Sequence, residues 1–303
     1  MPDGPIFPEP EYLRRQSALL SQLDINSILL IPTNKMKVRS HDVHFPFRAS
    51  SDILYLTGWE EPKALFVGHH DGTKWKTTLF VQDNNELAER WEGRRVGLSG
   101  AQERWPVDYA RDWESRLDVL EGWMQTKSTI YIQQGHDKDL DTMVNTLVTT
   151  KSREKTVTGK GPRAIIDPSS LLSELRIRKS ESEISIMREA AIIASKAHIH
   201  AMRNTQGDSN ESEIQSLIES TFMKNQSVPS YGSIVAGGDN ATILHYHANR
   251  DSVNDGSLIL IDAGCEVHGY ASDITRTWPV GGKFSQVQRL SLIHISEPTR
   301  HGL

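Results

Sequence analysis

The chain has 303 residues, enough for two domains of ordinary size, and its 37% hydrophobic and 24% charged content is typical of a globular protein with a core. A net charge of −5 gives no reason to expect a nucleic acid or an anionic membrane as partner. The single cysteine, Cys265, excludes an intrachain disulfide, and neither a signal peptide nor a membrane-spanning run is expected, so we predict a cytoplasmic protein.

The first half of the chain alternates helices and strands, a pattern typical of an α/β domain. An amphipathic helix is predicted over 8–24, because its apolar residues recur at helical spacing. A polar, glycine-bearing loop is expected over 151–161. Strands are predicted at 25–32, 64–67, 77–81 and 129–132, with the second and third forming a hairpin around His70-Asp71-Gly72.

Helix start signals mark the second half. A short helix is expected after Asp167-Pro168, and we place the domain boundary after residue 175. Capping boxes at Ser180 with Glu183 and at Asn210 with Glu213 each predict a longer helix. The buried faces of these two helices are expected to carry Ile184, Met187, Ala190, Ala191 and Ala194, and Ile214, Leu217, Ile218 and Phe222, respectively.

Two aspartates follow an apolar run at 258–261, which indicates a strand buried on both faces. If the next turn is centred on Val267 and His268, Asp262 and Asp273 lie opposite each other in an antiparallel hairpin, with Cβ atoms roughly 4.5–5.5 Å apart. Two like charges at this separation favour a shared divalent metal ion. The alternative is that Asp262 caps a turn and Asp273 is unrelated to it.

The segments Ile261-Asp262-Ala-Gly and Gly269-Tyr-Ala-Ser-Asp273-Ile-Thr-Arg-Thr-Trp-Pro resemble the first two metal-ligand segments of the pita-bread metallopeptidases, and within them the aminopeptidase P (Xaa-Pro aminopeptidase) family. The resemblance implies an α/β amino-terminal domain over 1–175, with a mixed sheet flanked by helices, and an incomplete α+β pita-bread domain over 176–289. It also implies that Asp262 binds one manganese ion (Mn²⁺) and Asp273 bridges two, although other divalent metals also suit such ligands.

Two patterns in the first half also resemble the family, in its creatinase/aminopeptidase-P amino-terminal domain: Pro46-Phe-Arg-x-Ser-Ser-Asp-x-x-Tyr-Leu-Thr-Gly58 and Trp91-x-Gly-Arg-Arg95. The resemblance implies that this domain shapes the mouth of the active site, that the protein is a homo-oligomer, and that Trp91 binds substrate in a neighbouring subunit's cleft. The alternative is a purely structural role for Arg48, Trp91, Arg94 and Arg95, because aromatic residues beside arginines more often pack or pair.

A third segment, 229–247, is similar to the one that brings a histidine to the edge of the metal centre in this family. The resemblance implies that His245 stabilises the substrate or the developing oxyanion, and that Tyr231 contributes to substrate binding. The alternative for His245, which follows an apolar pair, is a packed core histidine.

The reaction implied by the resemblance is removal of the N-terminal residue from peptides whose second residue is proline, with two metal ions activating water. A prolidase-type dipeptidase shares the same two ligands, and a non-catalytic interaction module is the alternative from another class. A creatinase, which uses no metal, is disfavoured because both aspartates are present.

The end of the chain departs from the family pattern after Arg289. The string 290–300 resembles a translated sequencing adapter, and a natural strand and turn is the alternative. The family's three further ligands, a histidine and two glutamates, are expected downstream of Asp273, but His294 and Glu297 lack the flanking motifs. We therefore expect a truncated chain with a non-native tail at 290–303 that is inactive as it stands.

Overall fold

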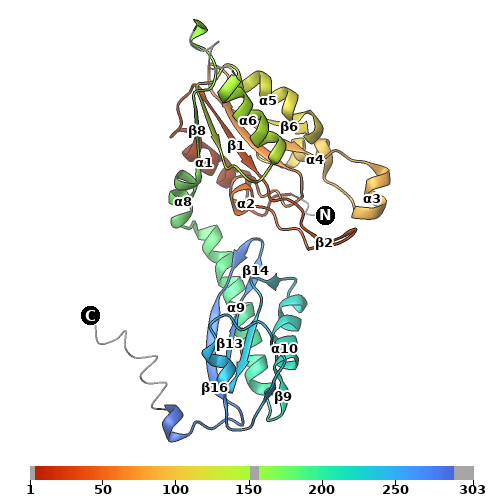
Figure 1. Ribbon diagram of the computed structural model, residues 1–303, viewed down its shortest axis with the longest axis vertical. Coiled ribbons are helices and arrows are strands. Elements are labelled where there is room, and N and C mark those ends of the chain that lie inside the picture. The colour runs from red at the N-terminus through yellow and green to blue at the C-terminus, as the bar shows by residue number, and fades with distance from the viewer. Residues whose placement is uncertain (1–3, 151–156, 290–303) are drawn as a thin grey trace, which may run out of the picture. The chain divides into compact units, whose positions relative to one another are not determined.

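A computed structural model describes residues 4–150 and 157–289 of the chain (Figure 1). The chain divides into two compact units, Met1–Arg178 and Lys179–Leu303. The tail at 290–303 lies outside the described residues, as does part of the loop expected at 151–161, so the prediction of a non-native tail stays a prediction.

The first unit is built on a six-stranded mixed sheet with the order β6-β5-β4-β1-β7-β8. Strand β1 is antiparallel to β4 and parallel to β7, and the hairpin expected between β4 and β5 is confirmed. A separate small hairpin is formed by β2 (Val38–Ser40) and β3 (Val43–His44). The strands of the sheet are β1 (Ser27–Pro32), β4 (Leu65–His70), β5 (Trp75–Val81), β6 (Tyr109–Asp112), β7 (Thr129–Ile132) and β8 (Ala164–Ile166).

Helices cover both faces of this sheet, which confirms the expected α/β class. Leu29 and Ile31 of β1 pack into one core cluster with α1 and α2, whereas Ile28 and Leu30 pack into a second cluster with α5 and α6. The helices of the unit are α1 (Glu9–Leu20), α2 (Ser51–Thr57), α3 (Glu86–Glu92), α4 (Gly97–Arg104), the 3-10 turn η1 (Trp113–Ser115), α5 (Arg116–Met124), α6 (Lys138–Thr150) and α8 (Ser169–Ile177).

The second unit has the expected α+β class, with helices and antiparallel strands. Two three-stranded sheets have the orders β11-β13-β16 and β10-β14-β15, and β9 pairs with β12. The elements are α9 (Glu181–Asn204), β9 (Ser209–Asn210), α10 (Glu211–Lys224), β10 (Val228–Pro229), β11 (Ile234–Gly237), the 3-10 turn η2 (Gly238–Thr242), β12 (Ser252–Val253), β13 (Leu258–Ala263), β14 (Cys265–Val267), β15 (Tyr270–Ala271) and β16 (Ile274–Pro279).

Both expected capping boxes are present, at the starts of α9 and α10. The expected inward face of α9 is wrong at Met187, which is 37% exposed. The stripe of α9 that faces the core passes through Ile186 instead, and continues through small residues at helical spacing that let the strands approach closely. Those residues are Ala190, Ala194, Ala197 and Ala201. No helix within the described part of the chain combines the length and apolar character that a bilayer crossing requires.

Candidate functional site

Strand β13 carries the first of the two aspartates on a partly open face. Ile259, Ile261 and Ala263 are fully buried in the core formed with α9 and α10, whereas Leu260 and Asp262 on the other face are only half-buried. The expectation of a strand buried on both faces is therefore wrong. The helices cover one face of this antiparallel sheet, and the carboxylate of Asp262 points from the other.

The register of the hairpin also differs from the predicted one. Val267 pairs with Tyr270, so the two turn residues are His268 and Gly269, both with positive φ (50° and 83°). This turn pairs Asp262 with Thr275 rather than with Asp273. Because the partner changes by two residues, Asp262 and Asp273 still lie on the same face, as diagonal rather than direct neighbours.

The hydroxyl of Tyr231 connects the two carboxylates. It lies 2.5 Å from Oδ1 of Asp262 and 2.9 Å from Oδ1 of Asp273. Tyr231 follows β10, which pairs with β14, and the preceding Ser230 donates its N–H to the carbonyl of Gly264 over 3.0 Å. Three of the five predicted site residues are thus brought together by pairing of β10 with the hairpin.

Gly264 makes this close approach possible. A Cβ atom at this position would lie 1.8 Å from the backbone oxygen of Ser272 and 2.9 Å from Oγ of Ser230. Ser230 Oγ also donates to that Ser272 oxygen over 3.0 Å. The glycine of the Asp262-Ala-Gly264 sequence therefore lets the segment that precedes Asp273 pass close to the end of β13.

The Tyr231 hydroxyl is uncharged, so it does not neutralise the carboxylates of Asp262 and Asp273. Burial, and then the hydrogen bonds to Asp262 and Asp273, raise the pKa of Tyr231 above its ordinary value, so the hydroxyl keeps its proton. A single proton can be donated to only one carboxylate at a time. A hard divalent cation would neutralise the pair, and carboxylate oxygens are the ligands such ions prefer.

The residues present fit a divalent metal ion but do not complete its coordination. Within the described part of the chain, no cluster of three or more histidine, cysteine, aspartate or glutamate residues is arranged to hold a metal. Asp262 and Asp273 are two carboxylates on one face, with four oxygen atoms at most, and a hard cation takes about six or more.

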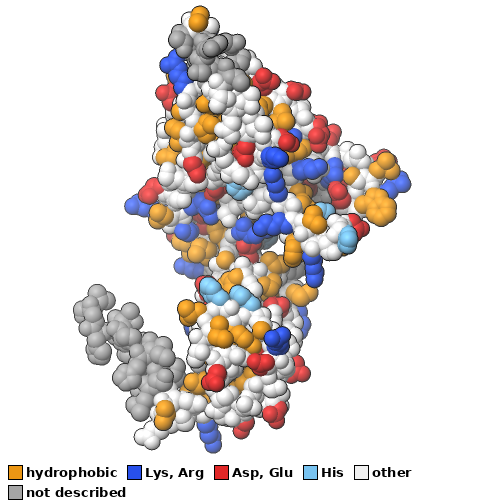
Figure 2. All heavy atoms as spheres, in the orientation of Figure 1, with side chains coloured by type: hydrophobic (Ala, Val, Ile, Leu, Met, Phe, Trp, Pro, Cys, Tyr) orange, Lys and Arg blue, Asp and Glu red, His pale blue; other side chains and the backbone are white. Residues whose placement is uncertain are grey.

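His245 lies in the loop after η2, and its side chain is exposed, so the alternative of a packed core histidine is wrong. Its ring stacks on His247, with 6.2 Å between centroids. Nδ1 of His247 lies 3.5 Å from the place where a Cβ on Gly232 would be, next to Tyr231. His245 is thus linked through His247 to the segment that carries Tyr231, and among the described residues it makes no hydrogen bond to either aspartate. Figure 2 shows histidine atoms at the surface of this unit.

The loop that carries His245 is anchored by Glu211, which the sequence analysis did not identify. Glu211 is fully buried at the start of α10, and its carboxylate accepts hydrogen bonds from Tyr246 Oη (2.8 Å), Gly237 N (2.8 Å), Asn240 Nδ2 (3.0 Å) and Asp251 N (3.0 Å). Four donors make burial of this carboxylate tolerable. In the sequence it looks like an ordinary acidic residue in the first turn of a helix.

The helix-facing side of the hairpin is closely packed. Nε2 of His198 lies 3.2 Å from the carbonyl oxygen of Ala263, and burial lowers the pKa of His198, which keeps its ring neutral. Cys265 is buried, with Sγ 3.4 Å from the carbonyl oxygen of Ala190. Tyr270 donates to Glu183 Oε1 over 2.8 Å, which ties the hairpin to the start of α9.

Trp91, the fifth predicted site residue, belongs to the first unit. It lies on α3 with 91% of its side chain exposed, and Figure 2 shows hydrophobic atoms at the surface over this helix. Its role in substrate binding stays a prediction. Arg48 donates to Ala49 O and Ser51 Oγ, and Arg95 pairs with Glu92 over 2.9 Å, contacts that suit the structural alternative for these two arginines.

Comparison with known proteins gives two family matches, one for each unit. The model of the aminopeptidase P N-terminal domain matches residues 12–131, and the model of metallopeptidase family M24 matches residues 185–295. The chain is 40% identical to the Xaa-Pro aminopeptidase of Haemophilus influenzae and 37% identical to that of Escherichia coli, over 93% and 92% of its length. It spans 64% of the length of each of these relatives.

The fold is likewise similar to a solved structure. Zinc-substituted aminopeptidase P from Escherichia coli, in complex with product, superposes with a TM-score of 0.89 at 36% identity. The match covers 97% of this chain and 68% of that one. The pita-bread resemblance noted from the motifs is thereby confirmed for the fold.

Proposed function

Because the chain belongs to the aminopeptidase P group of metallopeptidase family M24, we propose that it provides part of the catalytic site of an Xaa-Pro aminopeptidase. The reaction is release of the N-terminal residue from peptides whose second residue is proline. Support comes from the named relatives and from one observation in this structure, the pair of carboxylates that share the Tyr231 hydroxyl.

Each predicted site residue has a role in this proposal. Asp262 and Asp273 hold divalent metal, with Mn²⁺ as the preferred ion among those that suit oxygen ligands. When bound, the metal supplies Lewis acidity and a strong nucleophile at neutral pH. Tyr231 orients the two carboxylates, His245 donates a hydrogen bond to the developing oxyanion, and Trp91 contacts the peptide.

Metal binding can be tested on the chain as it is. Two carboxylates leave most of the coordination sphere to water, so we expect weak Mn²⁺ binding, measurable as enhanced water-proton relaxation. Asp262→Asn and Asp273→Asn should each abolish the enhancement, whereas Asp239→Asn, an exposed aspartate of the same unit, should retain it. Enhancement that survives in both site variants would contradict the proposal.

The activity requires a separate experiment, because the chain spans 64% of its relatives. With added Mn²⁺, the chain itself should not cleave Xaa-Pro peptides. Turnover that Asp262→Ala abolishes would show that the two ligands suffice.

A chimera of residues 1–289 followed by the carboxyl-terminal third of the Escherichia coli relative should release the first residue from an Xaa-Pro-Yaa tripeptide. Replacing proline by alanine in the peptide is the control. Cleavage of Xaa-Pro dipeptides alone would indicate a prolidase-type dipeptidase. A folded but inactive chimera would favour an interaction module.

We also propose a cytoplasmic homo-oligomer in which Trp91 contributes to a neighbouring subunit's site. Light scattering of the same chimera tests the oligomer. Loss of activity in Trp91→Ala with unchanged mass would support a role in the site, whereas loss of the oligomer would support a role in assembly.

A further inference from the structure

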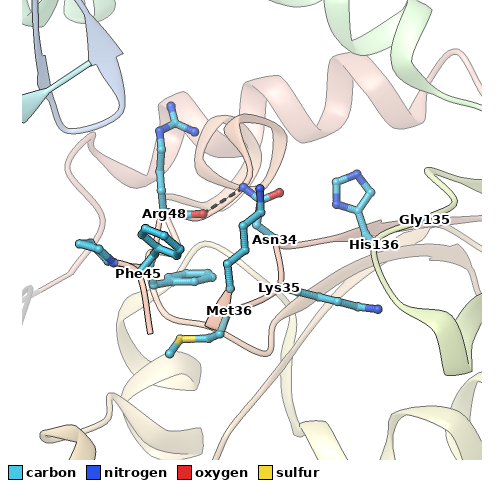
Figure 3. A pocket seen from close by; sticks show the side chains of 10 residues that line it. Asn34, Lys35, Met36, Phe45, Arg48, Gly135 and His136 are labelled. Carbon is cyan, nitrogen blue, oxygen red and sulfur yellow. Dashed lines mark hydrogen bonds between the residues drawn. The ribbon is translucent and has the colours of Figure 1, made fainter. Parts of the chain in front are cut away.

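The first unit contains an open pocket of about 630 Å³ at one edge of its sheet (Figure 3). One wall is residues 34–37, directly after β1, and another is Gly135 and His136, after β7. Because β1 and β7 are parallel, the loops that follow them meet at the same edge. This edge, beyond the carboxyl ends of parallel strands, is where open α/β sheets bind ligands, and the volume is in the range of ligand pockets.

The pocket is positively charged although the chain as a whole is acidic. Three basic residues, Lys35, Lys37 and Arg48, line it together with His136, and none of its lining residues is an aspartate or glutamate. The guanidinium of Arg48 donates to Ala49 O and Ser51 Oγ. Within the described residues no ion pair engages Lys35 or Lys37, whose side chains are exposed, so these two ammonium groups are available to an anion.

Large apolar side chains lie beside these lysines. Phe45 is 51% exposed and Met36 is 42% exposed, and Phe47 is half-buried next to them. The N–H of Phe45 donates to the carbonyl of Lys37 over 2.9 Å, so the apolar wall and the charged wall are held together at the base of the β2–β3 hairpin. Figure 3 shows Phe45 and Met36 at one end of the pocket and Lys35 extending toward His136.

We propose that this pocket binds peptides that end in an apolar residue with a free carboxylate. Lys35 and Lys37 bind the carboxylate, and Phe45, Phe47 and Met36 pack against the apolar side chain. A simple phosphate ion would use the lysines but leave the exposed aromatic wall uncovered, which favours the peptide. The proposal rests on the first unit alone and does not depend on the catalytic function proposed for the second.

The test uses the full chain and the peptide N-acetyl-Gly-Leu-Phe, with its affinity measured by ligand-observed NMR. The same peptide with a C-terminal amide loses both ion pairs and should bind up to about 25-fold more weakly, since each exposed ion pair contributes up to about fivefold. Each single lysine variant removes one of the two pairs. Lys35→Ala and Lys37→Ala should each weaken binding of the acid by up to about fivefold and leave binding of the amide unchanged. Phe45→Ala should weaken binding of both peptides.

Lys74→Ala is the matched control. Lys74 is an exposed lysine in the turn between β4 and β5, and the pairing of Pro32 with Leu65 places that turn at the opposite edge of the sheet. Equal binding of acid and amide would overturn the proposal, as would equal losses in Lys35→Ala and Lys74→Ala. Binding of inorganic phosphate that displaces the peptide while Phe45→Ala has no effect would overturn it in favour of a simple anion site.

Discussion

Strands β1 and β13 have similar apolar sequences but different surroundings. All six residues of β1, Ser27–Pro32, are buried, because helices pack on both faces of the sheet in the first unit. Along β13, Leu258–Ala263, buried and half-buried residues alternate, because α9 and α10 pack on one face. A run of large apolar residues therefore does not determine how many layers cover a strand.

This difference in burial matches a difference in role between the two strands. In the first unit the strand is locked into two core clusters and carries no titratable side chain. In the second, the partly open face of β13 carries Asp262, where a carboxylate can reach both Tyr231 and solvent. Four sets of substitutions test this contrast, beginning with the largest expected effect.

Leucine-to-alanine substitutions in β1 and β13 should show the difference in burial between the two strands most clearly. Leu30→Ala removes a fully buried side chain of β1 and should cost about 2–5 kcal/mol of unfolding free energy. Leu260→Ala on the open face of β13 should cost roughly 1 kcal/mol, because less surface is buried there. Hydrogen exchange followed by mass spectrometry reads each unit separately. Similar losses of protection in the two units would contradict the one-sided burial of β13.

Two glycine-to-alanine substitutions should change the free energy of unfolding in opposite directions. Gly264→Ala places a Cβ against the Ser272 oxygen and should destabilise the second unit by about 1–3 kcal/mol, and it should weaken Mn²⁺ binding by displacing Asp273. Gly122 lies in helix α5 with open space around its Cβ position, so Gly122→Ala should stabilise the first unit by about 0.5–1 kcal/mol. Chemical denaturation of each variant measures both effects. A neutral Gly264→Ala would show that the hairpin tolerates a wider separation.

Tyr231 should make the second unit sensitive to alkaline pH. The pKa of Tyr231 is raised in the folded state by burial and by the two carboxylates. Its contribution to the free energy of unfolding is therefore present below pH 10 and is lost as pH rises above that value. Tyr231→Phe should cost about 1 kcal/mol or less at pH 7, because the site is partly exposed. The stability difference between wild type and variant should shrink between pH 10 and 12, as followed by denaturation. A constant difference would show that the hydroxyl is not held between the carboxylates.

Trp91→Ala should have the smallest effect on stability. The side chain is exposed, so the change should stay within about 0.5 kcal/mol, whereas Trp59→Ala in the core of the same unit should cost about 3–5 kcal/mol. Thermal unfolding of the two variants gives the comparison. A large loss in Trp91→Ala would mean that α3 packs against something in solution.

Much of the fold follows from local signals in the sequence. The two capping boxes, the β4–β5 hairpin and the α/β pattern of the first unit were predictable because each depends on neighbouring residues. Which face of a helix or strand is buried was harder to predict. Met187 and Ile186 lie on adjacent sides of α9, and which of them faces the core depends on the strands that pack there.

The site was predictable in its residues more than in its geometry. Asp262, Asp273 and Tyr231 were all identified, but the turn was placed one residue too early. The signal was present, since a two-residue turn with both φ angles positive prefers glycine at its second position, which selects His268-Gly269. The shared Tyr231 hydroxyl and the buried Glu211 network depend on contacts between distant segments, which no local pattern encodes.

The buried thiol of Cys265, the single cysteine of the chain, gives the second unit a built-in reporter. A reagent in solution can modify its sulfur only when the hairpin separates from α9. The rate of alkylation under native conditions therefore counts opening events of the hairpin that carries both aspartates. The first unit contains no thiol, so opening of the first unit does not contribute to the measured alkylation rate.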